Sequence, residues 1–323
     1  MKTVVMVMVA FSLAACASRH VYESPYVIHE RAHSGGSVVA FSRSGALLAS
    51  GGWEGTVHLW QLPQGSHVRR WQAHEGTVNG IAFIAADRQI VTAGYDGVLA
   101  SWNTGGGRVA RIDTGAPVTH MEADAAGQRL VTGHTDGSVR LWRLPDLALL
   151  REQVLHRGSV KAVAIDPGFR RYASAGTEGD VLVWPEAGEA RALQAPPADA
   201  WTLAFAPDGN RLLGGSWFRL FRWDLDDGSL TTIPTGHHGI IKSIQFLPGG
   251  KRLASISRQT DSAVYFLDPE TGTVRRRFQR HELCGADIAV SPGGRYLATT
   301  SDDASVRIWR LDKPERSEIR EAD

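Results

Sequence analysis

The sequence contains few cysteines and has a net charge close to zero. Of its 323 residues only two are cysteine, Cys16 and Cys284, and 35 basic residues stand against 34 acidic ones, which leaves a net charge of +1. Two cysteines exclude a disulfide-rich scaffold. The charge balance excludes a broad positive field, so we expect no nucleic-acid partner. The composition, 43% hydrophobic and 21% charged, is otherwise that of a globular chain with a substantial core.

Catalytic motifs are lacking as well. The sequence contains no Cys-x-x-Cys-His, no His-Glu-x-x-His and no Gly-x-Ser-x-Gly, and no glycine-rich loop stands between a strand and a helix to hold a phosphate. We therefore predict no catalytic residue, no cofactor and no metal. The neighbouring His237 and His238 are a weak metal signal, and the basic run 275–277 is typical of a solvated strand edge.

The apolar run near the N-terminus is too short to cross a bilayer. It follows Lys2 and extends from Val4 to Ala10 and on through Phe11, Leu13 and Ala15, whereas a spanning helix needs roughly 20 residues. Such a segment is typical of a secretory signal. It ends at Leu13-Ala14-Ala15-Cys16, which resembles the lipobox of bacterial lipoproteins. That resemblance implies cleavage before Cys16 and lipidation of its sulfur, with an ordinary signal cleaved near Ala15 or Ala17 as the alternative.

The lipobox resemblance also implies a location. Residues 1–15 would be a cleaved signal peptide and residues 16–25 a short lipidated tether. Two or three acyl chains anchor a protein stably, whereas one is marginal. In bacteria with two membranes, a residue other than Asp after the lipidated cysteine favours the outer membrane, and here that residue is Ala17. We expect a protein anchored to the cell envelope, in the outer membrane facing the periplasm.

An aromatic residue closes a short apolar segment seven times, at intervals of 39 to 43 residues. These residues are Trp60, Trp102, Trp142, Trp184, Trp223, Phe266 and Trp309. A period of that length indicates a repeat architecture, in which each unit buries its apolar face against its neighbours. Within each period three turn signals separate segments of strand length, among them the acidic-Gly pairs Glu54-Gly55 and Asp96-Gly97. Each repeat is therefore predicted to be a four-stranded antiparallel sheet in an all-β protein.

A histidine begins most repeats 27 to 29 residues before the closing aromatic, and with it the chain resembles the WD-repeat β-propeller family. The resemblance implies a seven-bladed propeller and a buried hydrogen-bonded relay of histidine, hydroxyl, turn acid and tryptophan. The matching residues are His33, Ser50, Glu54 and Trp60; His74, Thr92, Asp96 and Trp102; Thr132, Asp136 and Trp142; His156, Ser174, Glu178 and Trp184; and His281, Thr299, Asp303 and Trp309. The third repeat has Thr114-Gly115 in place of the histidine, and the fifth lacks the turn acid.

The ring is predicted to close through its own beginning. The segment from Val27 to Ala32 matches the outer-strand segments that precede His74 and His281, and nothing comparable follows Trp309. We therefore expect the N-terminal segment to be the fourth strand of the last blade, which removes exposed sheet edges. This places one propeller at residues 26–312 and a charged tail at residues 313–323.

The propeller resemblance implies a recognition surface at the rim, the face where outer-strand to inner-strand loops meet the turns between second and third strands. The residues expected there are Trp53, Tyr95, Lys161, Trp201, Ile240 and Lys242. Aromatic residues with lysines nearby are typical of protein interfaces, although some of them could instead fold back onto neighbouring blades. We expect a non-catalytic scaffold that binds a protein or peptide. The alternative is a propeller enzyme or small-ligand binder at the central tunnel, but the sequence shows no converging carboxylates or cations there.

Overall fold

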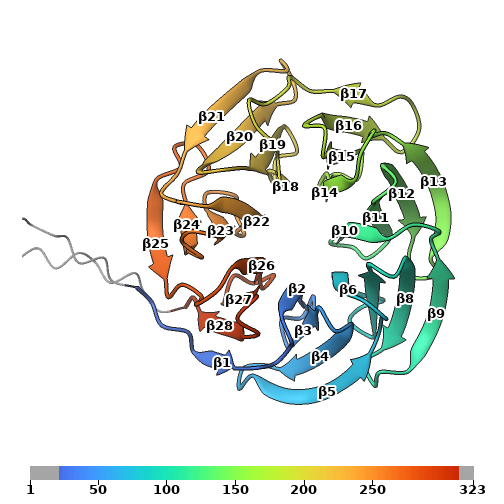
Figure 1. The fold of residues 1–323 in the computed structure, drawn as a ribbon, viewed down its shortest axis with the longest axis vertical. Helices are drawn as coiled ribbons and strands as arrows, with labels where there is room; N and C mark the ends of the chain where they lie inside the picture. The colour runs from blue at the N-terminus through green and yellow to red at the C-terminus, as the bar shows by residue number, and fades with distance from the viewer. Residues whose placement is uncertain (1–21, 313–323) are drawn as a thin grey trace, which may run out of the picture.

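The computed structural model describes residues 22–312, and every regular element in that part of the chain is a β-strand. The predicted signal peptide, Cys16 and the charged tail lie outside the described residues. No helix among residues 22–312 is long and apolar enough to cross a membrane. The strands form seven separate four-stranded antiparallel sheets arranged as a ring, which confirms the predicted all-β seven-bladed propeller (Figure 1).

Each blade runs from an innermost strand at the centre of the ring to an outer strand at its edge (Figure 1). The first three blades are β2 (Gly36–Phe41), β3 (Leu47–Gly52), β4 (Thr56–Gln61) and β5 (Ser66–Gln72); β6 (Val78–Ile84), β7 (Gln89–Gly94), β8 (Val98–Asn103) and β9 (Arg108–Asp113); and β10 (Val118–Ala123), β11 (Arg129–His134), β12 (Ser138–Arg143) and β13 (Ala148–Val154).

The next three blades follow the same order. They are β14 (Val160–Ile165), β15 (Arg171–Gly176), β16 (Val181–Pro185) and β17 (Arg191–Ala192); β18 (Thr202–Phe205), β19 (Arg211–Gly215), β20 (Arg219–Asp224) and β21 (Leu230–Pro234); and β22 (Ile240–Phe246), β23 (Leu253–Arg258), β24 (Val264–Leu267) and β25 (Val274–Phe278). All seven closing aromatics lie in the third strand of a blade, as the repeat pattern predicts.

The seventh blade is assembled from both ends of the described chain. It contains β26 (Gly285–Val290), β27 (Tyr296–Ser301) and β28 (Val306–Arg310), and its outer strand is β1 (Val27–His29). Strand β1 pairs antiparallel with β28, with Val27 opposite Ile308 and His29 opposite Val306. The predicted closure is thus confirmed, although the paired strand is shorter than the segment that resembles the other outer strands.

The hydrophobic core is divided among the contacts between neighbouring blades. Seven clusters of buried residues each combine side chains from two adjacent sheets, for example Ala173 with Phe221 between blades four and five, and Val290 with Phe266 between blades six and seven. The closing aromatics take part, and Phe266 is fully buried. Burial of a side chain of that size contributes about 1.5–3 kcal/mol. Because each interface needs both of its sheets, the loss of one blade weakens the interfaces with its two neighbours.

Glycine follows the turn acid because the backbone there is left-handed. Gly55 and Gly137 have φ angles of 79° and 81°. A Cβ atom at either position would lie 2.0 Å from the carbonyl oxygen of the histidine that opens the next blade, His74 or His156. The acidic-Gly pair therefore sets both the hairpin and the close approach of the following loop.

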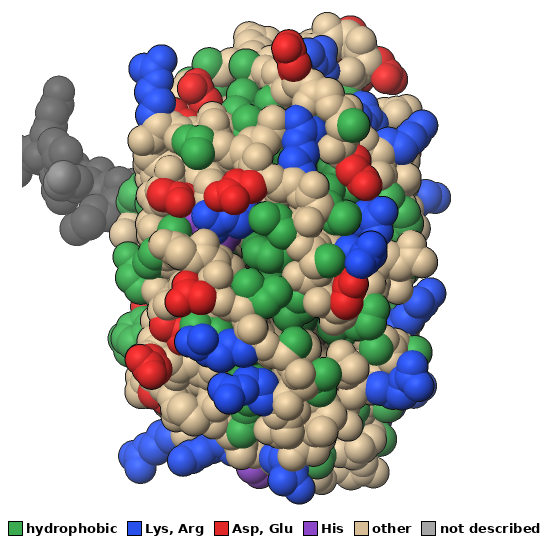
Figure 2. All heavy atoms as spheres, turned by 90° about the vertical axis from the view of Figure 1, so that its right-hand side faces the viewer, with side chains coloured by type: hydrophobic (Ala, Val, Ile, Leu, Met, Phe, Trp, Pro, Cys, Tyr) green, Lys and Arg blue, Asp and Glu red, His purple; other side chains and the backbone are tan. Residues whose placement is uncertain are grey.

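The flank that carries β9 and β13 mixes charges of both signs. Figure 2 shows Lys and Arg side chains interspersed with Asp, Glu and apolar groups over this flank. The exposed apolar side chains of the two outer strands are Val109, Leu149, Leu150 and Val154. This flank therefore presents no extended patch of one sign.

Candidate functional site

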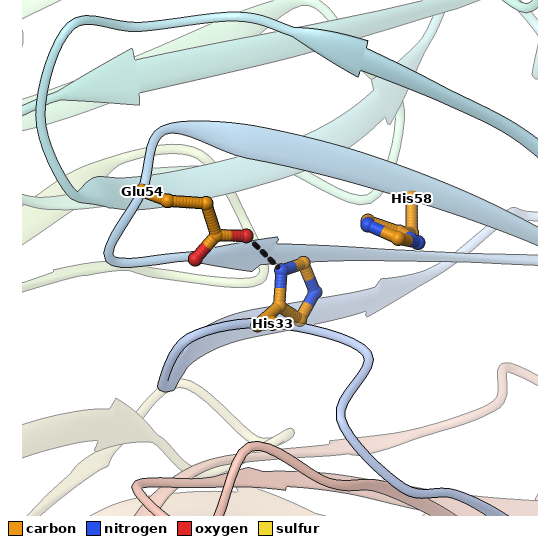
Figure 3. Close-up of side chains that lie close together, drawn as sticks. All are labelled: His33, Glu54 and His58. Atoms are coloured by element: carbon orange, nitrogen blue, oxygen red, sulfur yellow. Dashed lines mark hydrogen bonds and ion pairs between the residues drawn. The ribbon is translucent and has the colours of Figure 1, made fainter.

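The predicted relay is complete in the first and second blades. In blade one Trp60 Nε1 donates to Ser50 Oγ at 3.0 Å, Ser50 lies 2.9 Å from His33 Nε2, and His33 Nδ1 lies 2.9 Å from Glu54 (Figure 3). A carboxylate only accepts, so Nδ1 carries the proton and Nε2 accepts from the serine hydroxyl. Blade two repeats this arrangement through His74, Thr92, Asp96 and Trp102.

The relay prediction fails at the tryptophan in two other blades. In blade seven His281 contacts Thr299 and Asp303 as expected, but Trp309 Nε1 donates to the backbone carbonyl of Glu23 at 3.0 Å. In blade four His156 contacts Ser174 and Glu178, whereas the buried Trp184 Nε1 has no hydrogen-bond partner within residues 22–312. The assignments of Trp184 and Trp309 to the relay are therefore wrong.

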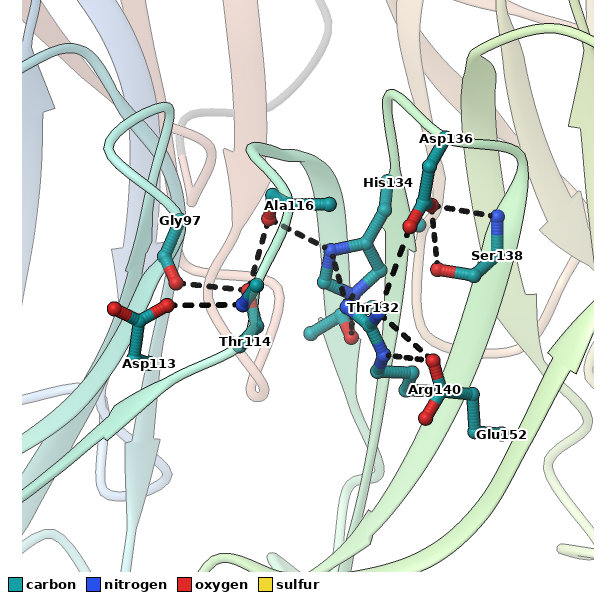
Figure 4. A network of polar contacts seen from close by, with 12 residues as sticks. Gly97, Asp113, Thr114, Ala116, Thr132, His134, Asp136, Ser138, Arg140 and Glu152 are labelled. Carbon is teal, nitrogen blue, oxygen red and sulfur yellow. Dashed lines mark hydrogen bonds and ion pairs between the residues drawn. The ribbon is translucent and has the colours of Figure 1, made fainter.

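In blade three the relay contains a histidine from another position in the repeat, His134. His134, at the end of β11, is fully buried; its Nε2 lies 2.8 Å from Thr132 Oγ1 and its Nδ1 donates to the Ala116 carbonyl at 3.1 Å (Figure 4). Trp142 Nε1 donates to the same threonine hydroxyl. Thr114, which stands where the histidine of other blades begins the repeat, donates to the carbonyls of Gly97 and Ala116.

Asp136 of blade three faces an arginine instead of a histidine. Arg140 lies 3.6 Å from Asp136 and 2.8 Å from Glu152, and its guanidinium packs on His134 (Figure 4). Burial and the positive charge of Arg140 lower the pKa of His134 to about 4. The imidazole is thus neutral at pH 7, as the tautomer in the relay requires. Every relay histidine is held by its own blade, which is the arrangement of structural residues.

Titratable side chains do gather on the innermost strands, contrary to the sequence-based expectation. His120 and Glu122 lie on β10, Lys242 on β22 and Asp287 on β26, and the charges of Lys242 and Asp287 act on each other. Burial raises the pKa of Glu122 to about 8 and also raises that of Asp287. Glu122 is therefore protonated at neutral pH.

The inner polar groups bond to the backbone of the next blade. His120 Nδ1 accepts from the Val163 N–H at 3.3 Å, and Asp287 accepts from the Val39 N–H at 3.0 Å. Glu122 likewise accepts from a β14 N–H. An innermost strand has one free edge, and these side chains satisfy its backbone donors. Hydrogen bonds from the neighbouring backbone therefore account for His120, Glu122 and Asp287 on the innermost strands.

Two of the predicted rim aromatics are strongly exposed. Trp53 is 45% and Tyr95 is 54% exposed, and each occupies the turn between the second and third strands of its blade. The backbone N–H of Trp53 donates to the Gly35 carbonyl and that of Tyr95 to the Thr77 carbonyl, so each turn is fixed against the loop that enters the same blade. These two side chains are presented on rigid supports.

The remaining predicted rim residues are less available. Ile240 is only 4% exposed, so its predicted exposure is wrong: it forms a bridge with Trp217 of the neighbouring blade. Lys161 forms an ion pair with Asp199 and lies 4.3 Å from the ring centroid of the partly buried Trp201. Both side chains thus fold onto each other.

Lys242 is also partly buried, and it belongs to the inner polar group instead of the open rim. Burial, more than the nearby Arg258 charge, lowers its pKa. A desolvated lysine of this kind is poorly placed to meet a partner.

Sequence analysis missed three exposed apolar residues on the same face. Trp217 and Phe218 are 36% and 43% exposed in the turn between β19 and β20, and Leu283 is 56% exposed before β26. Trp217 directly follows Ser216 after the second strand, as Trp53 follows Gly52, and this alignment could have placed it at the rim. The missing turn acid of the fifth repeat hid the correspondence.

An open hollow of about 850 Å³ lies on this face between blades six and seven. It is lined by residues 259–262 and 279–282 together with Tyr22. Its lining is largely polar, and His281 within it is already held by Asp303 and Thr299. Asp261, which also lines the hollow, contacts His237 of blade six at 3.5 Å. Cys284 nearby is a free, partly buried thiol.

The family model of the WD domain, G-beta repeat, matches the chain at residues 26–61, 65–103, 109–143 and 272–310. These four stretches fall on blades whose strands and relays are described above. The chain contains WD40 repeats. The blades between residues 144 and 271 are WD40-like in their four-stranded form, although the family model does not match them.

The chain is also similar to parts of longer curated proteins. The chain is 25% identical to Striatin-4 of Mus musculus over 276 residues, covering 75% of this chain and 36% of the relative. It is 23% identical to the WD repeat-containing protein 26 homolog of Arabidopsis thaliana, covering 84% of this chain and 48% of that protein. The chain thus spans about a third to a half of the length of these curated relatives, which are eukaryotic.

Proposed function

We propose that this WD40-repeat protein is a non-catalytic interaction scaffold whose rim binds a protein or an exposed peptide. The observation that carries the proposal is the exposure of aromatic side chains at one turn position in three blades: Trp53, Tyr95 and Trp217, with Phe218 beside the last. Large aromatic anchors dominate the energetics of protein interfaces. Because the turns are fixed by backbone hydrogen bonds, binding costs little ordering entropy.

The relatives support a scaffold role in general terms. WD-repeat propellers such as those of the relatives above are typically protein-interaction modules and generally not enzymes. Their longer chains hold further segments that this chain does not match, so the identity of the partner does not follow from them.

We further propose that Cys16 anchors the scaffold to the bacterial cell envelope, in the outer membrane facing the periplasm. This part rests on the sequence Leu13-Ala14-Ala15-Cys16 and on Ala17 after it. A lipid tether would hold the rim close to membrane partners and raise its effective concentration there.

Mass spectrometry of the membrane-extracted protein tests the anchor. We expect a mature chain that begins at Cys16 and carries diacylglycerol and an additional acyl group, and a Cys16→Ser variant that accumulates as uncleaved precursor. A mature N-terminus at residue 16 or 18 without lipid would show that the ordinary signal is the correct alternative.

Replacing Trp53 and Trp217 together by Ala should reduce crosslinked partner at least about tenfold, because loss of two interface aromatics commonly costs more than 1.4 kcal/mol of binding free energy. The measurement is recovery of crosslinked complex in cells, with a photoreactive phenylalanine analogue at position 95.

The matched control is Phe169→Ala. Phe169 is 37% exposed but lies in the turn between β14 and β15, at the opposite end of its blade from the rim turns. Its loss should leave recovery unchanged. Wild-type recovery from the Trp53 and Trp217 double variant, with the circular dichroism spectrum preserved, would rule the rim out as the binding surface.

A further inference from the structure

A histidine in blade one is buried without any hydrogen-bond partner. His58 lies on β4, opposite Ser50 of the relay, and is only 7% exposed. Neither Nδ1 nor Nε2 makes a hydrogen bond within the described part of the chain. A buried polar ring with both nitrogens unpaired carries a desolvation penalty that the fold does not offset.

The same register position in other blades is occupied differently. Ala100 lies opposite Thr92 in blade two, and Leu182 lies opposite Ser174 in blade four. In blades three and seven the position holds Arg140 or Arg307, each of which forms an ion pair with the acid of its own turn. Blade one has neither an apolar side chain nor a paired cation there. Tyr265 of blade six also packs its ring on the relay histidine, but His58 places two ring nitrogens without a hydrogen-bond partner at this position.

His58 lies beside two other groups that can bind a metal. One ligand atom each from His33, Glu54 and His58 lies within 4.8 Å of the other two (Figure 3). The rings of His33 and His58 are 4.7 Å apart between centroids, and His67 on β5 lies 5.2 Å from His58. Two imidazole nitrogens and a carboxylate oxygen form a donor set that suits Zn²⁺ and neighbouring divalent transition metals.

The hydrogen bonding of the donor atoms favours such a site. Neither ring nitrogen of His58 has a hydrogen-bond partner that a cation would have to displace. Glu54 is held in place because its carboxylate accepts hydrogen bonds from His33, Thr56 and Ser34.

We propose that His58, Glu54 and His33 form a binding site for one divalent transition-metal ion of the zinc type. His58 is the anchoring ligand because its nitrogens have no competing partner. Glu54 supplies an oxygen, and His33 Nδ1 exchanges its hydrogen bond to Glu54 for the metal. The fourth position is open to water or to His67. The proposal is independent of what the rim binds.

Metal binding would reverse one hydrogen bond of the relay. In the metal-free relay the Ser50 hydroxyl donates to His33 Nε2. With a metal on Nδ1, the proton of the neutral His33 ring resides on Nε2, which then donates to Ser50 Oγ. That oxygen has two lone pairs and can accept from both Trp60 and His33. The tryptophan contact is therefore kept, while the Ser50 hydroxyl hydrogen loses His33 Nε2 as its acceptor.

Titration of the chelator-treated full-length protein with ZnCl₂ and with CoCl₂ tests the site. Wild-type protein should bind one Zn²⁺ per chain with a rise in Tm, and Co²⁺ should give the visible absorption of a four-coordinate site with nitrogen and oxygen ligands. His58→Leu removes a direct ligand, so it should weaken Zn²⁺ binding by more than the roughly 10- to 100-fold that loss of an outer-shell partner costs, and it should remove both signals. Leucine is chosen because Leu182 already occupies this position in blade four.

His238→Ala is the control, because His238 is exposed at the start of blade six and away from this cluster. It should bind Zn²⁺ as wild type does. If His58→Leu does not fold, His58→Ala serves in its place, since Ala100 fills the position in blade two. Failure of the wild type to bind Zn²⁺, or equal affinity and Co²⁺ spectra for wild type and the His58 variants, would overturn the proposal.

Discussion

Replacing residues 26–32 by seven Gly and Ser residues should lower the Tm by about 10 °C or more. The replacement keeps the chain length but removes β1, whose backbone pairs with β28 at Val306 and Ile308. It also removes Tyr26, whose N–H donates to the Ile308 carbonyl, and His29, whose ring stacks on Trp60 at 3.9 Å. Backbone hydrogen bonds contribute about 1 kcal/mol each, and the apolar contacts of Val27 add to them.

The expected loss of unfolding free energy is about 4 kcal/mol. Each kcal/mol lowers the Tm of a large domain by about 2–4 °C. Blade seven shares buried clusters with blades six and one, so opening it exposes interfaces on both sides. Thermal unfolding followed by calorimetry gives the measurement.

Blade four supplies a matched replacement. Its outer strand β17 has only two residues, Arg191 and Ala192, and both are exposed. Replacing them by Gly and Ser should lower the Tm by less than about 3 °C. If the two replacements had equal effects, the N-terminal strand would be an ordinary edge and not the closure of the ring.

The repeat and its closure could be predicted from sequence because they depend on local patterns. Alternating apolar segments, acidic-Gly turns and a closing aromatic determine each blade almost by themselves, and β1 is recognised because it resembles β5 and β25. The relays of blades one and two follow from the same pattern, since all of their partners lie within one repeat.

What sequence reasoning missed depends on contacts between repeats. Ile240 is buried and its backbone forms a bridge with Trp217 of the preceding blade, and Trp309 donates to the backbone carbonyl of Glu23, near the other end of the described residues. Glu122 and Asp287 accept hydrogen bonds from the next innermost strand. A one-residue shift in strand register turns a side chain to the other face, so such pairings cannot be read from the pattern of one blade.

The three candidate metal ligands could not be recognised from the sequence either. His33 and Glu54 have a clear relay role in the sequence, and His58, four residues after Glu54, fits no metal-binding spacing. Only the pairing of β3 with β4 brings the His58 ring beside the relay. Whether His58 only fills space in the core or offers a metal ligand thus becomes visible only once the hydrogen-bond partners of its ring nitrogens are known.

Thr92→Val should destabilise the protein by about 3 kcal/mol. The Thr92 hydroxyl accepts from Trp102 Nε1 at 2.9 Å and lies 2.8 Å from His74 Nε2, so one buried hydroxyl joins two other polar groups. Valine has nearly the same shape but leaves both groups buried and unpaired, and each unsatisfied group costs about 1–3 kcal/mol. Urea unfolding at pH 7 gives the free energy.

Thr300→Val separates the loss of the relay from the loss of a hydroxyl as such. Thr300 is also fully buried in a second strand, but its Oγ1 has no hydrogen-bond partner among residues 22–312. Removing that hydroxyl leaves no other polar group without its hydrogen-bond partner, so the variant should be as stable as the wild type or slightly more stable. Equal destabilisation by the two valines would mean that the buried hydroxyls matter through packing alone. A large difference would identify hydrogen-bond continuity between tryptophan and histidine as what holds the second blade together.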